Sequence, residues 1–560
     1  MKKKWEYVAP NKEIVDKISE ETGIPNIIAG ILANRGITKK EQIEVFLNPT
    51  RNNFYDPYLL EDMEIAVNEI MQIIEKHGSI LIYGDYDVDG ITSTTVLKKF
   101  LEERGLETGY YIPDRLDEGY GLNMKAMDYI ANEKYTLMIT VDCGISGIEE
   151  VDYIKKLGVD VIITDHHEPL EELPKALAVI DSKRKDNTYP FNQLAGVGVV
   201  FKVIQAISIK LGLDEKEYLK YLDLVCVGTI SDIVPLVDEN RVIAKLGLML
   251  VNVTKNIGLK TLLKASGFTT CDENTVSFGI APRINACGRM GNAIEALELL
   301  LTEDPKKAEE LTYRLNEYNR QRQEIEKNIF KEAMEQIENE SKNDVIVVSH
   351  ENWHHGVIGI VASKITEMYF KPSILLCLEN GIAKGSGRSV PGFDLHGSLC
   401  ACSNLLEKYG GHAMAVGLSL KLDNLEAFKN KLEDIAKENK VNEIVPVIYI
   451  DAQITNKDFN IDFVKQIKQL QPFGESNKVP IFIYKNLKID SIRTLTEGKH
   501  LKLTLKDENN IINSIGFNMG HLGDDFRIGD KVDIVGNIEI NSFNGNDTVQ
   551  INMKDIMKSI

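Results

Sequence analysis

Residues 80–90 read Ile80-Leu81-Ile82-Tyr83-Gly84-Asp85-Tyr86-Asp87-Val88-Asp89-Gly90. The apolar run predicts a buried strand, and the glycine-flanked aspartates predict a loop at the carboxyl end of that strand. Three carboxylates this close repel one another unless protons or a cation neutralise them. The stretch therefore predicts an α/β fold with a cation site at the end of a strand.

Other apolar runs along the chain also end in acidic residues. The candidate strands cover residues 80–83, 137–141, 159–164 and 178–180. The acids that follow them are Asp85, Asp142, Asp165 and Asp181. Strands and helical segments alternate from about residue 61 to 255, which predicts a parallel sheet. Ligands bind beyond the carboxyl ends of strands in such sheets, so we expect these acids to converge at one edge.

Carboxylates and an imidazole make up the candidate metal-ligand set. Its members are Asp87, Asp89, Asp142, His166 and Asp232. Oxygen-rich ligation with one imidazole suits Mn²⁺, and suits Mg²⁺ less well because imidazole is a softer donor. Two ions about 3.5–4 Å apart could share a carboxylate, activate water and stabilise the leaving oxygen of a phosphoester. We expect Asp142 to be the shared carboxylate.

These residues allow two alternative interpretations. The pattern Asp85-x-Asp87-x-Asp89-Gly90 matches the first half of a calcium-binding EF-hand loop. That loop needs a glutamate at its twelfth position, where this chain has Val96, and it needs a preceding helix rather than a strand. Single aspartates such as Asp232 are more often helix caps or turn residues. The joint placement of the acids at strand ends favours the metal site.

With 560 residues, the chain is long enough for several domains. We predict a helical lead-in (residues 1–60), an α/β domain (61–255), a helical connector (256–339), a smaller α/β domain (340–437) and a C-terminal β domain (438–560). The connector contains one long amphipathic helix over about 304–339. Period-two alternation, as in Leu501-Lys502-Leu503-Thr504-Leu505, predicts a small barrel of OB type, with a sandwich as the alternative.

Charge and composition restrict the function classes. The formal net charge of −19 argues against non-specific binding of nucleic acid through a basic surface. Bound cations cancel part of that charge, however, and a local basic groove can coexist with an acidic exterior. No apolar run is long enough to span a membrane, and no signal peptide follows Met1-Lys2-Lys3-Lys4. The seven scattered cysteines are interpreted as reduced core residues of a cytoplasmic protein.

Several motifs resemble known families. Asp87-x-Asp89-Gly90, Asp142, Asp165-His166-His167 and Asp232 resemble the DHH phosphoesterase superfamily, and Gly410-Gly411-His412 resembles the glycine-rich motif of its partner DHHA1 domain. The segments 282–290, 353–363 and 471–474 resemble the RecJ family of single-strand-specific 5′→3′ exonucleases. The resemblance runs from about residue 60 to the end.

The resemblance implies roles for the residues that carry it. Asp87, Asp89, Asp142, His166 and Asp232 would hold two Mn²⁺ or Mg²⁺ ions. Catalytic roles beside them would fall to Asp85, His167 and His412. It also implies a DHH domain and a smaller DHHA1 domain joined by the long helix, with an OB-like domain for nucleic acid. Many relatives have a metal-binding histidine four residues before the first ligand aspartate, where this chain has Tyr83. The first metal is then held more weakly, or Asp85 compensates.

An exonuclease must also bind a chain end. Ser386, Arg388 and Arg289 are the best candidates for a 5′-phosphate pocket, because a guanidinium fork suits phosphate oxygens. Arg115 is a weaker candidate that the resemblance also supports. We interpret residues 385–389 as a glycine-rich loop whose backbone N–H groups approach the ligand. The alternative for any single arginine is a surface salt bridge.

The expected function is a metal-dependent exonuclease. It would degrade single-stranded DNA 5′→3′ to mononucleotides in DNA repair and recombination. A helicase and a single-strand-binding protein are partners that the resemblance implies, and no membrane is expected. One alternative is a DHH-type phosphodiesterase of short oligonucleotides or cyclic dinucleotides. Another is a catalytically silent replication scaffold, which the intact ligand set disfavours.

Overall fold

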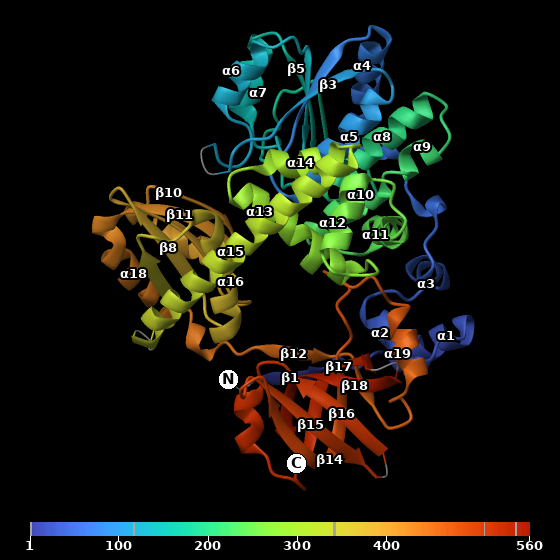
Figure 1. The fold of residues 1–560 in the computed structure, drawn as a ribbon, viewed down its shortest axis with the longest axis vertical. Coiled ribbons are helices and arrows are strands. Elements are labelled where there is room, and N and C mark those ends of the chain that lie inside the picture. Colours follow the sequence, from blue (N-terminus) through green and yellow to red (C-terminus); the bar gives the residue numbers. More distant parts are fainter. Residues whose placement is uncertain (1–2, 116–117, 340–342, 509, 544–545, 560) are drawn as a thin grey trace. The chain divides into compact units, whose positions relative to one another are not determined.

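The computed structural model of the chain describes residues 3–115, 118–339, 343–508, 510–543 and 546–559 (Figure 1). These residues form two compact units. The α/β unit comprises residues 55–234 and 247–445, and the barrel unit comprises residues 1–54, 235–246 and 446–560. Each unit is described by itself below.

The first sheet of the α/β unit has five strands, all parallel, in the order β3-β2-β4-β5-β6. The strands are β2 (Ser79–Tyr83), β3 (Glu107–Tyr111), β4 (Leu137–Val141), β5 (Asp160–Asp165) and β6 (Ala178–Asp181). The helices between them are α5 (Val88–Glu102), α6 (Met124–Ala131) and α7 (Ile148–Lys156), with α4 (Met63–Glu75) before the sheet. The predicted parallel sheet is confirmed, and the acidic loop follows a strand rather than the helix of an EF-hand.

A helical segment follows the first sheet. It contains α8 (Gly196–Lys210), α9 (Lys216–Leu219), α10 (Leu222–Ser231), α11 (Asp238–Val251), α12 (Ile257–Ala265), a π-helical turn (Thr275–Ile280), α13 (Ala281–Arg289) and α14 (Ala293–Leu301). The residues of α11 up to 246 belong to the barrel unit. The predicted long helix is confirmed as α15 (Pro305–Asn339). It leads directly into the second sheet of the unit.

The second sheet is mixed, in the order β10-β11-β9-β8-β7. Its strands are β7 (Ile346–His350), β8 (Ser373–Glu379), β9 (Ile382–Arg388), β10 (Lys408–His412) and β11 (Ala415–Lys421). The helices are α16 (His355–Tyr369), α17 (Leu395–Ala401) and α18 (Leu425–Glu438). One face packs against α17 and α18, and the β7–β8 part of the other face packs against α15 and α16.

The prediction of a glycine-rich loop at residues 385–389 is wrong, because residues 385–388 belong to β9. Packing explains these glycines better than turn geometry does. A Cβ atom on Gly385 would lie 2.4 Å from Leu376, and one on Gly387 would lie 2.7 Å from Val416. As a central strand, β9 directs its backbone hydrogen bonds to β8 and β11. A ligand here therefore meets side chains rather than free backbone N–H groups.

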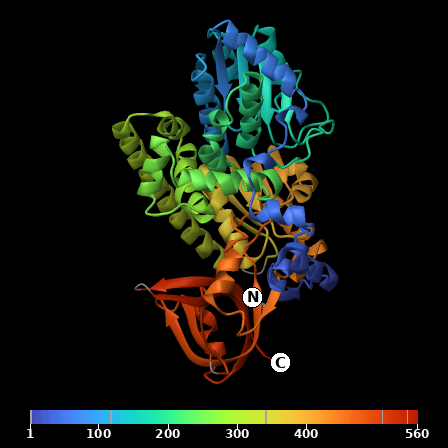
Figure 2. The same cartoon turned by 90° about the vertical axis from the view of Figure 1, so that its right-hand side faces the viewer.

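The barrel unit is built on a closed sheet in which β14 pairs with both β15 and β17 (Figure 2). Its strands are β14 (Phe482–Leu495), β15 (His500–Asp507), β16 (Asn510–Gly516), β17 (Lys531–Phe543) and β18 (Asn546–Lys558). Two shorter strands, β12 (Val447–Ile450) and β13 (Ala452–Ile454), precede it. The predicted barrel is confirmed, since closure excludes an open sandwich.

Residues from the start of the chain belong to the same unit. The strand β1 (Lys4–Tyr7) pairs in parallel with β12. The helices α1 (Lys12–Thr22), α2 (Asn26–Asn34) and α3 (Lys40–Leu47) share an apolar core with α19 (Ile461–Lys468) and the barrel. The buried guanidinium of Arg241 donates to the carbonyl oxygens of Phe46, Leu470 and Pro472. The domain boundaries drawn from the sequence stay a prediction.

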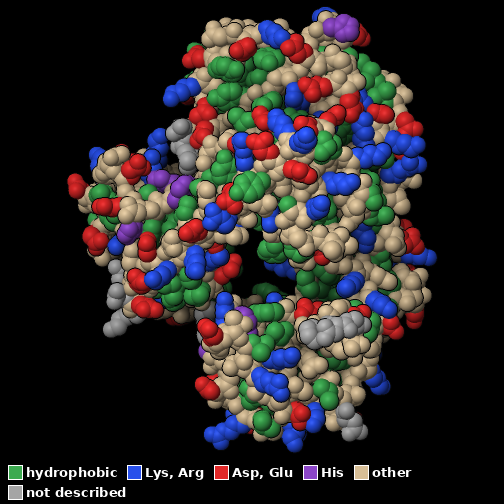
Figure 3. All heavy atoms as spheres, viewed as in Figure 1, with side chains coloured by type: hydrophobic (Ala, Val, Ile, Leu, Met, Phe, Trp, Pro, Cys, Tyr) green, Lys and Arg blue, Asp and Glu red, His purple; other side chains and the backbone are tan. Residues whose placement is uncertain are grey.

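The surface and the cysteines bear on the other predictions. Figure 3 shows acidic and basic side chains interspersed over the visible face, without one large field of either sign. None of the seven cysteines forms a disulfide; six are buried, but Cys400 is exposed, so its interpretation as a core residue is wrong. Among the helices of the described residues, none has both the length and the apolar character needed to cross a bilayer.

Candidate metal centre and anion pocket

The predicted metal ligands converge at the carboxyl edge of the first sheet. Asp142 directly follows β4, His166 directly follows β5, and Asp232 ends α10. The Nε2 atom of His166 lies 3.1 Å from Oδ1 of Asp142, 3.6 Å from Oδ2 of Asp232 and 3.9 Å from Oδ2 of Asp89. The structure thus brings together residues that lie as much as 143 positions apart in the sequence.

Three groups of ligand atoms form, each with all its atoms within 4.8 Å of one another. The groups are Asp142, His166 and His167; Asp89, His166 and Asp232; and Asp85, Asp87 and Asp142. Asp142 and His166 each belong to two groups. Asp85, which we expected beside the metals in a catalytic role, stands here with the ligands. The grouping fits a site for two divalent cations, and the shared role of the Asp142 carboxylate stays a prediction.

Helix N-termini hold two of the aspartates in place. Oδ1 of Asp87 caps α5 by accepting the backbone N–H groups of Asp89 (2.9 Å) and Gly90 (3.1 Å). The two carboxylate oxygens of Asp89 accept the N–H groups of Gly196 (2.7 Å) and Val197 (2.8 Å), at the start of α8. The positive end of a helix favours ionised carboxylates. Both acids therefore have fixed positions before any cation binds.

Asp142 has a strained backbone. Its φ is +61°, in the left-handed region, which aspartate tolerates better than most residues do. A Cβ atom on Gly196 would lie 2.6 Å from Oδ1 of Asp142, so only glycine fits beside it. Strain of this kind collects at functional sites. The glycines of Gly196-Val197-Gly198 were a signal for this contact that the sequence interpretation missed.

The electrostatics of the centre fit a cation. In the described parts of the chain, buried atoms of Asp85 (Oδ1), Asp142 (Oδ1) and His166 (both ring nitrogens) have no hydrogen-bond partner. Burial and neighbouring acids raise the pKa of Asp89 to about 7 and that of Asp232 to about 9. Burial, with the neighbouring His167, lowers the pKa of His166 to about 3, so its imidazole is neutral and ready to bind metal. Hard oxygen donors with one imidazole suit Mn²⁺ or Mg²⁺.

Asp165 orients the two histidines rather than joining the ligands. Its Oδ1 accepts the backbone N–H of His166 (2.7 Å) and lies 2.7 Å from Nδ1 of His167, while Oδ2 accepts the N–H of Ile145 (2.9 Å). Burial lowers the pKa of His167, but the hydrogen bond to Asp165 outweighs it and the pKa rises to about 9. The hydroxyl of Tyr120 lies 3.1 Å from the same Nδ1. Sequence reasoning missed Tyr120, because a lone loop tyrosine forms no pattern.

Tyr83 does not replace the missing histidine ligand. Its hydroxyl donates to the carbonyl oxygen of Gly121 (3.0 Å), and its ring stacks on Tyr111 with centroids 5.3 Å apart. The side chain belongs to an apolar core. The buried Oδ1 of Asp85 remains as the group that can take the missing ligand's place, so weaker binding of the first metal stays a prediction.

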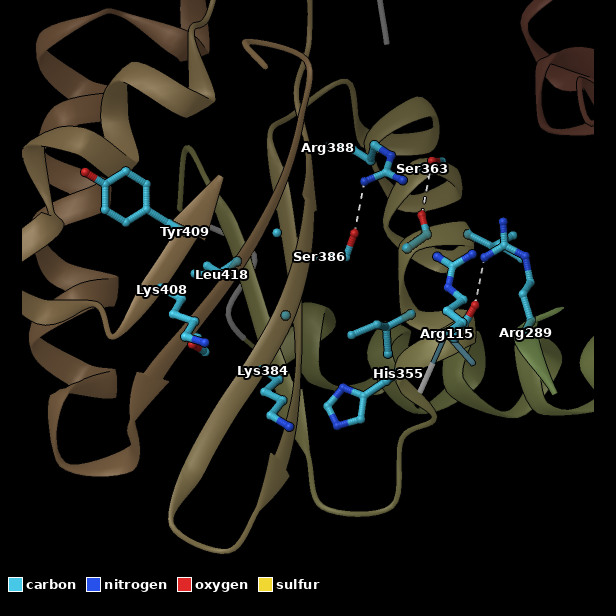
Figure 4. A pocket seen from close by; sticks show the side chains of 17 residues that line it. Arg115, Arg289, His355, Ser363, Lys384, Ser386, Arg388, Lys408, Tyr409 and Leu418 are labelled. Atoms are coloured by element: carbon cyan, nitrogen blue, oxygen red, sulfur yellow. Dashed lines mark hydrogen bonds between the residues drawn. The ribbon is translucent and has the colours of Figure 1, made fainter. Parts of the chain in front are cut away.

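All four predicted phosphate-binding residues line one cavity of about 720 Å³ in the α/β unit (Figure 4). They are Arg115, Arg289, Ser386 and Arg388. A guanidinium N–H of Arg388 donates to Oγ of Ser386 (3.0 Å), and one of Arg289 donates to the carbonyl oxygen of Gly356 (2.8 Å). The structure therefore brings together three arginines and a hydroxyl from three separate segments.

The arginines repel one another, which makes the cavity an anion site. Burial lowers the pKa of Arg289 to about 10, and the positive charges of Arg115 and Arg388 add to the effect. The guanidinium of Arg115 lies over the ring of Tyr86, 5.0 Å from its centroid. Because Tyr86 lies in the acidic loop between Asp85 and Asp87, the anion pocket adjoins the metal centre.

His412 does not line this cavity. It is exposed at the end of β10. The strand register places it opposite Ala415, which in turn lies opposite Arg388, so the three form one row across the sheet. Lysines that the sequence interpretation did not single out, Lys384 and Lys408, do line the cavity. Only the strand register, which the sequence does not display, brings them there.

Three family models match the chain. The DHH family N-terminal domain matches residues 79–229, the DHHA1 domain matches residues 325–438, and the RecJ OB domain matches residues 450–555. Together they cover the first sheet, the second sheet and the barrel. The C-terminal prediction of an OB-like barrel thus has support from sequence and fold alike.

Curated relatives and solved structures are similar to nearly the whole chain. It is 39% identical over 561 residues to the single-stranded-DNA-specific exonuclease RecJ of Bacillus subtilis (strain 168), covering 99% of this chain and 71% of that protein. It is 33% identical to the protein of that name from Haemophilus influenzae, covering 90% and 92%. RecJ from Thermus thermophilus with Mn²⁺ gives a TM-score of 0.87 at 29% identity, covering 100% and 80%; the same protein with Mg²⁺ gives 0.81 at 28%, covering 100% and 79%.

Proposed function

Since this chain belongs to the RecJ family of exonucleases, we propose that it degrades single-stranded DNA from the 5′ end and releases mononucleotides. The observation that carries the proposal is the adjacency of an acidic metal centre and an arginine-lined pocket within one unit. A 5′ phosphate held in the pocket would leave the next phosphate of the strand at the metal centre. That spacing selects a chain end and removes one nucleotide at a time.

The residues of the pocket would bind and orient the terminal phosphate. Arg388 and Arg289 offer charged donor forks, and Ser386 offers a hydroxyl beside the first of them. A strand with a 5′ hydroxyl would leave these half-buried arginines without their anion. We therefore expect a preference for 5′-phosphorylated ends.

The residues of the metal centre would position the reacting phosphodiester. Asp87, Asp89, Asp142, His166 and Asp232 would hold two Mn²⁺ or Mg²⁺ ions, with Asp85 beside them. Bound ions supply an activated water and neutralise charge on the leaving oxygen. The imidazolium of His167, held by Asp165, would donate a hydrogen bond to a phosphate oxygen.

A single-stranded DNA substrate has consequences for the role of the barrel, the cellular location and the protein partners. The barrel, which matches the RecJ OB domain, would bind the strand through stacking and backbone contacts. The protein would act in the cytoplasm, in repair and recombination. A helicase and a single-strand-binding protein would supply and protect the strand.

A phosphodiesterase of short oligonucleotides or cyclic dinucleotides is the second candidate. It would need the same metal centre. A cyclic dinucleotide has no terminal phosphate, however, and would not use the arginines of the pocket. The C-terminal barrel would also have no role.

Degradation of end-labelled oligonucleotides tests the proposal. Single strands labelled at either end are incubated with Mn²⁺, Mg²⁺ or a chelator, beside a duplex and a dinucleotide. We expect mononucleotide release from the 5′ end of single strands only, and none with chelator. Turnover of the dinucleotide above that of a long strand would favour the second candidate, and degradation from the 3′ end would refute the polarity.

A further inference from the structure

The face of the second sheet that lines the anion pocket is arranged in rows. Lys384, Ser386 and Arg388 alternate along β9, so their side chains share one face. Ser386 and Arg388 are the pocket residues already described. Lys384 lies on the other side of Ser386 from Arg388. It is two positions from Ser386, a distance of about 6.6–6.8 Å along the strand.

The strand register adds a second lysine beside the first. Lys384 lies opposite Ser419 on β11, and Ser419 lies opposite Lys408 on β10. Directly opposed residues of antiparallel strands point to the same face. Lys384, Ser419 and Lys408 therefore form one row across three strands, next to the row that contains Ser386.

The row of Ser386 continues across β11 and β10 with two glycines. Ser386 lies opposite Gly417, and Gly417 lies opposite Gly410. A Cβ atom on either glycine would meet nothing within 4 Å, and neither φ lies in the left-handed region. Neither packing nor backbone conformation therefore requires glycine here. What the two glycines provide is an open floor between the row of lysines and the arginines.

The two lysines have no anionic partner of their own. Lys384 and Lys408 are exposed, and within the described residues neither forms an ion pair or a side-chain hydrogen bond. Glu379 is an acid near the pocket, and its carboxylate lies 3.6 Å from Nε2 of His355, which lines the pocket. Figure 4 shows Lys384 and Lys408 at one end of the pocket, Arg115 and Arg289 at the other, and Ser386 between them.

We propose that Lys384, Ser419 and Lys408 form a second anion subsite, which binds phosphates attached beyond the 5′-terminal one. This inference rests on the proposed function. The arginine end of the pocket adjoins the metal loop through Tyr86, so the strand runs from Ser386 and Arg388 towards the metals. The row of lysines lies on the other side of Ser386, where a 5′-diphosphate or 5′-triphosphate would extend.

The subsite predicts a distinctive first product. Water attacks the phosphorus of the first internucleotide phosphodiester, the bond from that phosphorus to O3′ breaks, and O3′ takes up a proton. The 5′-oligophosphate stays on the released nucleotide. A triphosphorylated strand therefore yields one nucleoside 5′-triphosphate, followed by nucleoside monophosphates.

The test compares one single strand carrying a 5′ monophosphate with the same strand carrying a 5′ triphosphate. The double variant Lys384→Gln/Lys408→Gln is measured beside Lys437→Gln, a control that removes a lysine of α18 outside the pocket. We expect the wild type to degrade both strands. In the double variant, kcat/KM on the triphosphorylated strand should fall about three- to tenfold, which is the size expected for the loss of two exposed charge contacts. On the monophosphorylated strand, kcat/KM should fall less than about twofold.

The outcomes separate the inference from the proposed function. If the wild type degrades neither strand, the proposed function fails. If the wild type degrades the monophosphorylated strand but not the triphosphorylated one, the strand-end subsite is refuted. It is also refuted if the double variant has the same ratio of kcat/KM on the triphosphorylated strand to kcat/KM on the monophosphorylated strand as the wild type has. A further arm adds free dATP at constant free Mn²⁺. In one outcome, dATP inhibits the wild type but not the double variant, and the triphosphorylated strand is not degraded. That outcome would overturn the strand-end subsite and show that these lysines bind a free nucleotide.

Discussion

The metal centre and the anion pocket lie in the same unit but gather side chains of opposite charge. In the metal centre, acids crowd together on strand ends and helix N-termini, and backbone N–H groups fix Asp87 and Asp89 before a cation arrives. In the pocket, cationic side chains crowd together on a strand face, on α13 and on the loop after β3, with few partners of their own. The first site is set by backbone geometry and the second by side chains. Changes in the first should therefore abolish chemistry, whereas changes in the second should alter the choice of strand end.

The sharpest test of this contrast is Asp142→Asn. Asparagine tolerates the left-handed backbone of Asp142 but removes the charge that two groups of ligand atoms share. We expect kcat to fall more than about 10³-fold, beyond the loss typical of a single electrostatic group. Binding of single-stranded DNA should change little.

The measurement pairs nuclease rates with binding of a fluorescent strand in chelator. Asp152→Asn on α7, an acid outside the three ligand groups, is the matched control and should keep its activity. Normal metal-dependent turnover in Asp142→Asn would contradict the shared role of this carboxylate.

The pocket should respond differently, as Arg388→Gln will show. A charge-assisted hydrogen bond contributes about 1.5–3 kcal/mol, so kcat/KM on 5′-phosphorylated strands should fall about 10- to 150-fold. On 5′-hydroxyl strands the loss should be small, because that end offers no anion to the guanidinium. Equal losses on the two kinds of strand would show that Arg388 does not read the terminal phosphate.

The smallest expected effect is that of pH and Mg²⁺ on the stability of the fold. It is measured as Tm in chelator and in Mg²⁺. Asp89 (pKa about 7) and Asp232 (pKa about 9) hold protons in the folded state that the unfolded chain, with aspartate pKa values near 4, releases. In chelator, these two groups therefore make the fold less stable as pH rises from about 4 to about 9.

Mg²⁺ should reverse that trend by taking the place of the protons. At a hundredfold excess over Kd it contributes about 2.7 kcal/mol, or a few degrees in Tm, with a larger gain at pH 8 than at pH 5.5. Asp142→Asn should show a reduced gain. If the gain in Tm with Mg²⁺ were the same at pH 5.5 and pH 8, the cation would not act by relieving repulsion among the crowded acids.

Sequence reasoning found the acids of the metal centre because strand ends carry a local signal. Each of Asp85, Asp142 and Asp165 follows a short apolar run, and parallel pairing is enough to bring such ends together. Asp232 instead closes an apolar run interpreted as helical, and the family resemblance supports its place in the ligand set. The contact between Gly196 and Asp142 carried a weaker signal, because a glycine at a helix start has several possible causes.

The strand face of the pocket was beyond local reasoning. Glycines at 385 and 387 suggested a loop, although both are glycines because neighbouring side chains leave no room for a Cβ. Lys384 and Lys408 are 24 positions apart, and only the pairing of three strands places them in one row. Arg388 and Ser386 were found by chemistry rather than by position. Register is a tertiary property, which single-sequence patterns do not encode.

The pairing of β1 with β12 affects how the chain is made. Lys4 lies beside Val447, so the first strand finds its partner only after more than 400 further residues have left the ribosome. The α/β unit, complete by residue 445, can fold before then. The helices α1–α3 meanwhile expose an apolar surface that awaits the barrel. Synthesis thus leaves residues 4–47 among the last to be buried, although they precede the α/β unit, and we expect the nascent chain to depend on chaperones during that interval.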